Sequence, residues 1–220
     1  MSAATSPRRV RADAERSTAR ILDAARAVLA DDPNASLERI ADAAGLARAT
    51  VHRRFASRAA LLETLSARLN ALFLDVVRRA RVATAPPLVA LHRATELIFE
   101  LKLSHRSVMM ATMDAGTGRT MLSPEVREGV DLLFARLHAA GAVAAGNPDW
   151  CRRIYLAVLN EVDLLPADDP ELTPGAGDEL GARTNLTVRT VLGALGAHPD
   201  AVASFAPAPS GDSETRRPVT

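Results

Sequence analysis

The amino-acid sequence predicts an all-α protein in which a small N-terminal domain precedes a larger helical domain. Ala, Leu and Arg, which favour helix, dominate the 220 residues, and aromatic residues make up only 3% of them. Apolar residues recur at helical spacing in one segment after another, and no segment has the alternation typical of a strand. Both features indicate helices throughout.

The first helix is predicted over residues 16–30, where apolar side chains recur every three to four positions. Residues 1–11 are polar, rich in arginine and contain Pro7, so we expect a disordered arm there. Asp31, Asp32 and Pro33 end the helix, because the residue before a proline avoids helical geometry.

Three more helices follow in quick succession. Ser36 is a good N-cap for a short second helix that ends at Gly45, a residue suited to the left-handed geometry after a helix. A third short helix is expected within residues 46–55, and Ser57 can cap a fourth that runs towards residue 81. We therefore place a helix-turn-helix domain at residues 12–57.

The second domain is expected at residues 58–205. Helix starts are marked by a proline or an N-cap residue at Pro86-Pro87, Ser123-Pro124 and Asn147-Pro148, and a last helix is expected over 179–195. Residues 206–220 are rich in Pro, Ser and charge, which predicts a disordered tail.

Charge is distributed unevenly along the chain. Residues 1–60 hold eleven arginines against seven acidic residues, a net charge of +4, whereas residues 61–220 hold 16 Lys and Arg against 19 acidic residues, a net charge of −3. A basic end on an acidic body favours a polyanionic partner for the first sixty residues. Scattered surface charge without a partner is the alternative.

The sequence LARATVHRRF, residues 46–55, predicts a helix that buries only Leu46, Val51 and Phe55 and carries three arginines and a histidine. Burial alone gives no reason for such a helix. Insertion into the DNA major groove does, because the groove admits one helix and Arg pairs with guanine and phosphate. Thr50 and His52 can bond phosphate oxygens, and small Ala49 allows close approach to the bases.

The segment LERIADAAGLARATVHRRFASRAALLETL, residues 37–65, together with ARILDAARAVLA, residues 19–30, resembles the DNA-binding domain of the tetracycline-repressor (TetR) family of transcriptional regulators. The resemblance covers about residues 16–65, and the rest of the chain matches in length and helical pattern alone. It implies DNA-facing positions at Arg48, Ala49, Thr50, His52, Arg53 and Arg58.

Three residues depart from the family pattern. His52 stands where Tyr is usual, Ala47 replaces the usual Ser and removes an N-cap, and Arg58 replaces the usual Lys. The first two leave open a helical adaptor that has lost DNA binding. A small helical enzyme is the other alternative, although the sequence has no phosphate-binding loop, nucleophile elbow or His-Glu-x-x-His spacing. A gel shift with neighbouring intergenic DNA would separate these alternatives from a repressor.

The family resemblance also implies a ligand-responsive homodimer. An apolar or aromatic effector of low charge is expected, with candidate lining residues Phe99, His105, Met109, Met113, Trp150 and Tyr155. Core packing of these same residues is the alternative. Dimer contacts are expected from two helices near 148–164 and 179–195, through Ile154, Val158, Val188, Val191, Leu192 and Leu195.

We expect no cofactor, no metal site and no catalytic residue. The single Cys151 excludes an internal disulfide, and scattered histidines are not a ligand set. No apolar run approaches the roughly 20 residues that a membrane span needs. A cytoplasmic repressor that binds a palindromic operator in double-stranded DNA as a homodimer, and leaves it when a small molecule binds, is the function that the sequence predicts.

Overall fold

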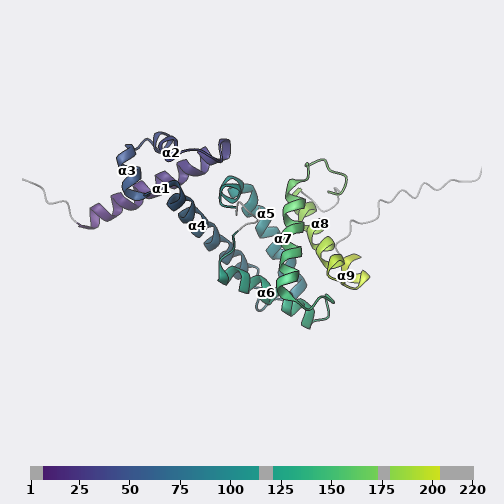
Figure 1. The fold of residues 1–220 in the computed structure, drawn as a ribbon. Helices are drawn as coiled ribbons and strands as arrows, with labels where there is room; N and C mark the ends of the chain where they lie inside the picture. The colour runs from purple at the N-terminus through teal and green to yellow at the C-terminus, as the bar shows by residue number, and fades with distance from the viewer. Residues whose placement is uncertain (1–6, 114–120, 173–178, 204–220) are drawn as a thin grey trace, which may run out of the picture. The chain divides into compact units, whose positions relative to one another are not determined.

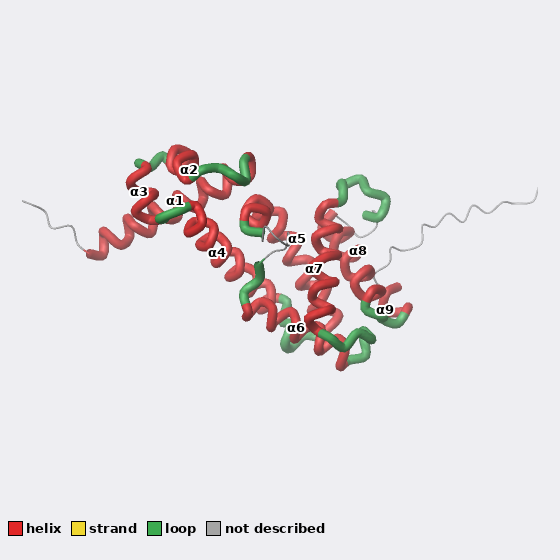
Figure 2. The backbone as a smooth tube through the Cα atoms, viewed as in Figure 1, coloured by secondary structure: helices red, strands yellow, loops and turns green. Residues whose placement is uncertain are grey.

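The computed structural model describes residues 7–113, 121–172 and 179–203, which form helices and connecting loops without a strand (Figure 2). This confirms the predicted all-α fold. In chain order the helices are α1 (Pro7–Asp31), α2 (Leu37–Ala44), α3 (Arg48–Arg54), α4 (Arg58–Arg79), α5 (Pro87–Ala111), α6 (Pro124–Ala139), α7 (Pro148–Leu164), α8 (Glu179–Ala194) and α9 (Pro199–Ala203) (Figure 1).

Several predicted boundaries needed correction. α1 begins at Pro7, so residues 7–11 belong to a helix and not to a disordered arm, while residues 1–6 lie outside the described part. α5 continues past Met109 and Met110 to Ala111, with a kink at His105 (φ −132°, ψ 17°). The short helix α9 was not predicted, and the expected tail at 206–220 lies outside the described residues.

The chain divides into two compact units. One consists of Met1–Arg79 with Glu100–Gly129, and the other of Ala80–Phe99 with Val130–Thr220. The division therefore lies elsewhere than the expected boundary between residues 57 and 58, because α4 belongs to the first unit up to Arg79 and the chain later returns to that unit.

The core of the first unit comes from one apolar face of each of its helices. The buried side chains of its first four helices include Ile21, Leu22, Leu29, Leu37, Ile40, Val51, Phe55, Leu61 and Leu65. The periodicity of the sequence predicts the same residues. α4 and α6 approach closely in this unit, since a Cβ atom added at Gly129 would lie 2.6 Å from a methyl carbon of Val77.

The second unit is built around an aromatic pair. The rings of Phe134 and Tyr155 meet edge to face, with centroids 5.6 Å apart, and both side chains are buried. The Tyr155 hydroxyl lies 3.1 Å from Thr95 Oγ1, so the buried phenol has a partner. Arg183 of α8 donates to the carbonyl oxygens of Val162 and Leu165, which satisfies the C-terminal end of α7.

Tyr155, the only tyrosine, gives a spectroscopic prediction. Burial raises the pKa of its phenol from 10.0 to about 12, with the Thr95 hydrogen bond acting in the opposite direction. Because the folded chain holds the neutral phenol, stability from this group is complete below pH 10 and is lost as the pH rises towards 12. Two pH units correspond to about 3 kcal/mol.

Tyrosinate absorbance should therefore appear near pH 12 in the folded protein and near pH 10 in denaturant. Tyr155→Phe is the control, because Thr95 keeps its bond to the Leu91 carbonyl and the alkaline loss of stability should shrink. Tyrosinate that forms near pH 10 while the helical circular dichroism is intact would contradict the buried environment.

Candidate nucleic-acid interface

Helix α2 is defined by its two ends. The Ser36 hydroxyl accepts a hydrogen bond from the Arg39 N–H at 3.2 Å, as expected of an N-cap. At the other end Gly45 has φ 61° and ψ 38°, the left-handed geometry that glycine adopts without steric cost. Both predicted signals are confirmed, and together they limit α2 to eight residues.

The turn between α2 and α3 is also held from α1. The Arg20 guanidinium donates to the carbonyl oxygen of Ala44 at 2.7 Å, one of the carbonyls left unpaired where α2 ends. The backbone N–H of Leu46 donates to the Ala41 carbonyl at 3.1 Å, which closes the turn. These bonds fix where α3 begins relative to α2.

Helix α3 buries only Val51 within its seven residues, and Phe55 is buried just after it. Arg48, Ala49, His52, Arg53 and Arg54 are exposed, and Thr50 is half-buried. Ala47 provides no side-chain cap, as its identity predicts. The sequence-based expectation of a short basic helix that presents most of its side chains to solvent is confirmed.

Two side chains of α3 are paired with carboxylates of α2. His52 Nε2 lies 3.3 Å from Glu38 Oε1, and Arg48 Nη2 lies 3.7 Å from Asp42 Oδ2. Hydrogen bonds from its own backbone N–H, from the Ser36 hydroxyl and from His52 hold the pKa of Glu38 below its ordinary value. Glu38 is therefore an anion at neutral pH.

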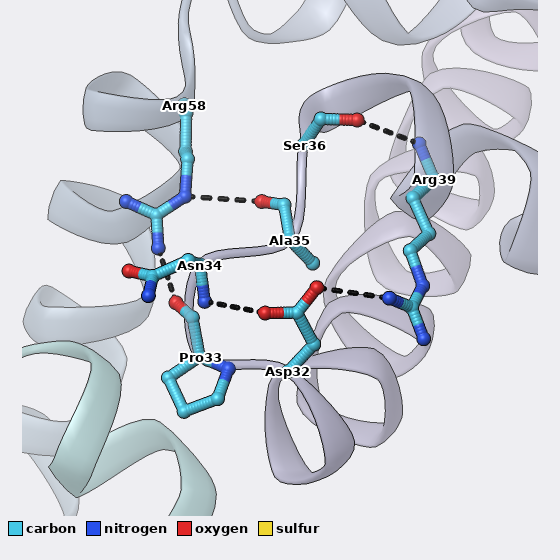
Figure 3. A network of polar contacts seen from close by, with 7 residues as sticks. All are labelled: Asp32, Pro33, Asn34, Ala35, Ser36, Arg39 and Arg58. Carbon is cyan, nitrogen blue, oxygen red and sulfur yellow. Dashed lines mark hydrogen bonds and ion pairs between the residues drawn. The ribbon is translucent and has the colours of Figure 1, made fainter.

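The family resemblance implies that Arg58 faces DNA, but its guanidinium bonds backbone carbonyls of the same chain (Figure 3). Its Nε donates to the Ala35 carbonyl at 3.1 Å, and its Nη2 donates to the Pro33 carbonyl. The same loop is held by Asp32, whose carboxylate accepts from the Asn34 N–H at 3.0 Å and from Arg39 Nη1 at 2.8 Å. The guanidinium of Arg58 thus joins the start of α4 to the α1–α2 loop.

A hollow of about 700 Å³ lies in the first unit, along α4 and beside the end of α5 and residues 121–125. Leu62, Leu74, Met113 and Met121 contribute apolar lining, and Glu63 and Glu125 contribute the charged groups. Asn70 connects its walls, because its side-chain amide donates to the Met121 carbonyl at 3.1 Å and accepts from the Ser123 N–H at 2.6 Å.

Comparison with known proteins supports the interpretation of the α2–α3 surface. Residues 21–65 match the family model described as bacterial regulatory proteins, tetR family. The chain is 42% identical over 87 residues to the HTH-type transcriptional repressor LfrR of Mycolicibacterium smegmatis, strain ATCC 700084 / mc(2)155. The match covers 40% of this chain and 46% of that relative, so the chain spans about half the length of the curated relative.

Solved structures extend the likeness beyond the first unit. The LfrR structure from Mycobacterium smegmatis in complex with proflavine is 27% identical, with a TM-score of 0.52 over 82% of this chain and 94% of its own. The likeness to TetR-type regulators therefore extends over most of the chain, while the family model itself matches residues 21–65. PfmR, a TetR-family regulator from Thermus thermophilus, shares the fold at 20% identity, with a TM-score of 0.58 over 77% of this chain and 97% of its own.

The predicted ligand-binding residues divide between the two units. Phe99 and Tyr155 are buried in the second unit, while Trp150 of that unit is 53% exposed. In the first unit Met109 is buried and His105 is half-buried at the kink of α5. Among the six, only Met113 lines the hollow.

His105 lies near Arg26 of α1, in the same unit. Burial first, and then the nearby charge of Arg26, lower its pKa, so the imidazole is neutral at neutral pH. The Arg26 guanidinium donates to the Ser104 carbonyl at 3.1 Å, and the Ser107 hydroxyl donates to the Arg26 carbonyl at 3.1 Å. These contacts join α1 to α5 on both sides of the kink.

The predicted dimer residues separate into two groups. Val188, Val191, Leu192 and Leu195 are at most 2% exposed, so a single chain already covers them. Ile154 and Val158 are half-buried on α7. On the same helix Trp150 and Leu164 are exposed, the latter by 70%, and sequence periodicity did not single out Leu164.

In the described part of the chain, no cluster of three or more His, Cys, Asp or Glu is arranged to hold a metal ion. None of the described helices combines the length and apolarity needed to cross a membrane.

The ion pairs between α2 and α3 were not predicted from the sequence. The signal was present, because the acidic Glu38 and Asp42 have the same four-residue spacing as the basic Arg48 and His52.

Arg58 should act on the stability of the first unit. Arg58→Ala and Arg58→Lys should both lower the free energy of unfolding by about 1–3 kcal/mol, because hydrogen bonds from a charged donor are lost and lysine cannot span both carbonyls. Thermal and urea unfolding measure this. The control is Arg54→Lys, at an exposed position. Unchanged unfolding of Arg58→Lys would mean that the positive charge matters and the bonds to Pro33 and Ala35 do not.

Proposed function

We propose that this chain is a sequence-specific transcriptional repressor that binds double-stranded operator DNA through α3. The observation that supports this most directly is that α3 buries only Val51 while Arg48, His52, Arg53 and Arg54 are exposed beside a tightly capped turn. A helix presented in this way fits the major groove. The match of residues 21–65 to the TetR family model, together with the similarity to the repressor LfrR, supports the same function.

Within this proposal the exposed side chains of α3 have separate roles. Arg48 reads a base edge, because its guanidinium can make a bidentate pair with guanine. Ala49 lets the backbone approach the bases, and Thr50, His52 and Arg53 contact phosphates. Arg58 is not among the phosphate contacts, because two of its nitrogens bond the α1–α2 loop.

Selection of binding sequences from a random pool of duplex DNA tests the proposal. We expect the full-length protein to enrich a palindromic site, because a two-fold pair of recognition helices contacts two half-sites. Arg48→Ala should weaken binding to that site by about 1–3 kcal/mol and relax the preference at one position of each half-site.

Arg53→Ala is the matched variant. It should weaken binding to all duplexes alike and lower the salt dependence by about one counterion per lost contact. If the protein enriches no sequence, it is not a sequence-specific regulator, and the alternatives of a helical adaptor or a small helical enzyme take its place. Binding of both variants at wild-type strength would show that α3 is not the contact surface.

We propose that the protein pairs through α7. Trp150, Ile154, Val158 and Leu164 follow one face of this helix, and two of them are largely exposed. Large exposed apolar groups that recur along one helix face are typical of a protein interface. The buried side chains of Val188, Val191 and Leu192 on α8 would support α7 without contacting the partner chain. A charge at Val188 or Leu192 would therefore destabilise the fold of the single chain.

We also propose that a small molecule binds in the hollow beside α4 and releases the DNA. Support comes from its size, its mainly apolar lining and its few polar groups, which are typical of a small-molecule site. The structure of the related LfrR in complex with proflavine agrees with an effector of this kind. With Glu63 and Glu125 as the charged lining groups, an apolar neutral or cationic aromatic compound fits better than a polyanion.

Filling the hollow should block this response. A compound that releases DNA from the wild-type protein should bind Ala71→Phe at least about ten-fold more weakly, because the ring takes the space of the ligand. DNA affinity without the compound should stay unchanged. Arg79→Phe puts the same ring on α4 away from the hollow and should respond like wild type. If the compound released DNA from Ala71→Phe at the same concentration as from the wild-type protein, the effector would bind elsewhere.

A further inference from the structure

The two ion pairs between α2 and α3 form a regular arrangement. Glu38 and Asp42 are four residues apart on α2, and Arg48 and His52 are four residues apart on α3, so Glu38 faces His52 and Asp42 faces Arg48. The distances are 3.3 Å for Glu38–His52 and 3.7 Å for Asp42–Arg48. Two carboxylates therefore lie beside the side chains that the proposed function assigns to DNA.

Helix stability does not account for Asp42. This residue lies in the last turn of α2, where a carboxylate opposes the helix dipole and destabilises the helix. Its pair with Arg48 is open to water, since the two side chains are 66% and 64% exposed, and exposed pairs add little to stability. The carboxylate needs another reason.

Attraction to phosphate does not account for it either. A carboxylate beside the contact surface repels the phosphates of every DNA sequence alike. Arg53 and Arg54 are exposed on the same helix and form no ion pair with the described residues, so they remain available for phosphates. The Asp42 carboxylate is thus directed at Arg48, and the Glu38 carboxylate contacts His52 in addition to its hydrogen bonds at the start of α2.

A carboxylate next to an arginine restricts its rotamers, because it accepts from one part of the guanidinium and leaves the other N–H groups for a base. We propose that Asp42 and Glu38 are positioning residues that determine specificity: they orient Arg48 and His52 for the correct site and weaken binding to all other DNA. This rests on the proposed function. Repulsion lowers non-specific binding, whereas at the correct site the preorganised base contact offsets it.

The test compares two duplexes of equal length, the sequence selected by the wild-type protein and an unrelated one. Asp42→Asn should bind the unrelated duplex about three- to ten-fold more tightly and the selected duplex no more tightly than wild type, so their affinity ratio falls. Glu38→Gln should act in the same direction. Asp75→Asn is the matched control, because it removes one charge and the pairs with Arg78 and Arg79 on α4.

A double-mutant cycle separates positioning from overall charge. In the Arg48→Ala background, Asp42→Asn should no longer change the preference at the base position that Arg48 determines, because the residue to be oriented is absent. Thermal unfolding serves as the folding control, and Asp42→Asn should melt no lower than wild type, since it removes an unfavourable charge from the end of α2.

Three results would overturn the inference. The first is an equal change of both duplexes with Asp42→Asn, as expected of bulk charge alone. The second is an effect of Asp42→Asn on base preference that persists without Arg48. The third is a wild-type protein that prefers no duplex, in which case the proposed function fails first and the inference falls with it.

Discussion

The proposed DNA-contacting surface depends on two helices that are too short to be stable alone. α2 has eight residues and α3 has seven, and isolated helices below roughly 12 residues are marginal in water. Their geometry is imposed from outside. Arg20 of α1 bonds the carbonyl at the end of α2, and Arg58 at the start of α4 bonds the loop before α2. The exposed arginines of α3 are thus held in place by two other arginines, Arg20 and Arg58, that bond backbone carbonyls.

This division of labour changes the meaning of the charge distribution. The first sixty residues carry a net charge of +4, but the charge does not form a uniform field. Arg20 and Arg58 are committed to backbone carbonyls, Arg39 to Asp32, and Arg48 to Asp42. Among the arginines of α3, Arg53 and Arg54 remain without an ion pair to any described residue. The number of basic residues indicates a polyanionic partner. Which of them lack an ion pair indicates which are available to contact its phosphates.

Local signals could be predicted from the sequence because each depends on a few neighbouring residues. Ser36, Gly45 and Asn147 act at helix ends as their identities predict, and the apolar period identifies the core of the first unit. The apolar period could not predict that Val188 is buried whereas Trp150 is exposed. A period identifies an apolar face but not what covers it, and the answer depends on how distant helices pack.

Arg58 shows the same limit for a polar residue. Its position in the family pattern suggests a phosphate contact, yet its partners, Pro33 and Ala35, are backbone carbonyls more than twenty residues earlier. Nothing in the side chains of those residues marks them as acceptors, since every residue offers a carbonyl. The hollow beside α4 was missed for a related reason, because its walls come from segments far apart in the sequence.

The close approach of α4 and α6 has a consequence for how this sequence can vary. Any side chain at Gly129 would overlap Val77, whose methyl carbon would lie 2.6 Å from the added Cβ. The two positions are therefore unequal in mutational tolerance: Val77 can become smaller at the cost of a void, whereas Gly129 cannot become larger unless its partner gives way. Drift at this crossing has to proceed in a fixed order, with a smaller residue at 77 arriving before a larger one at 129.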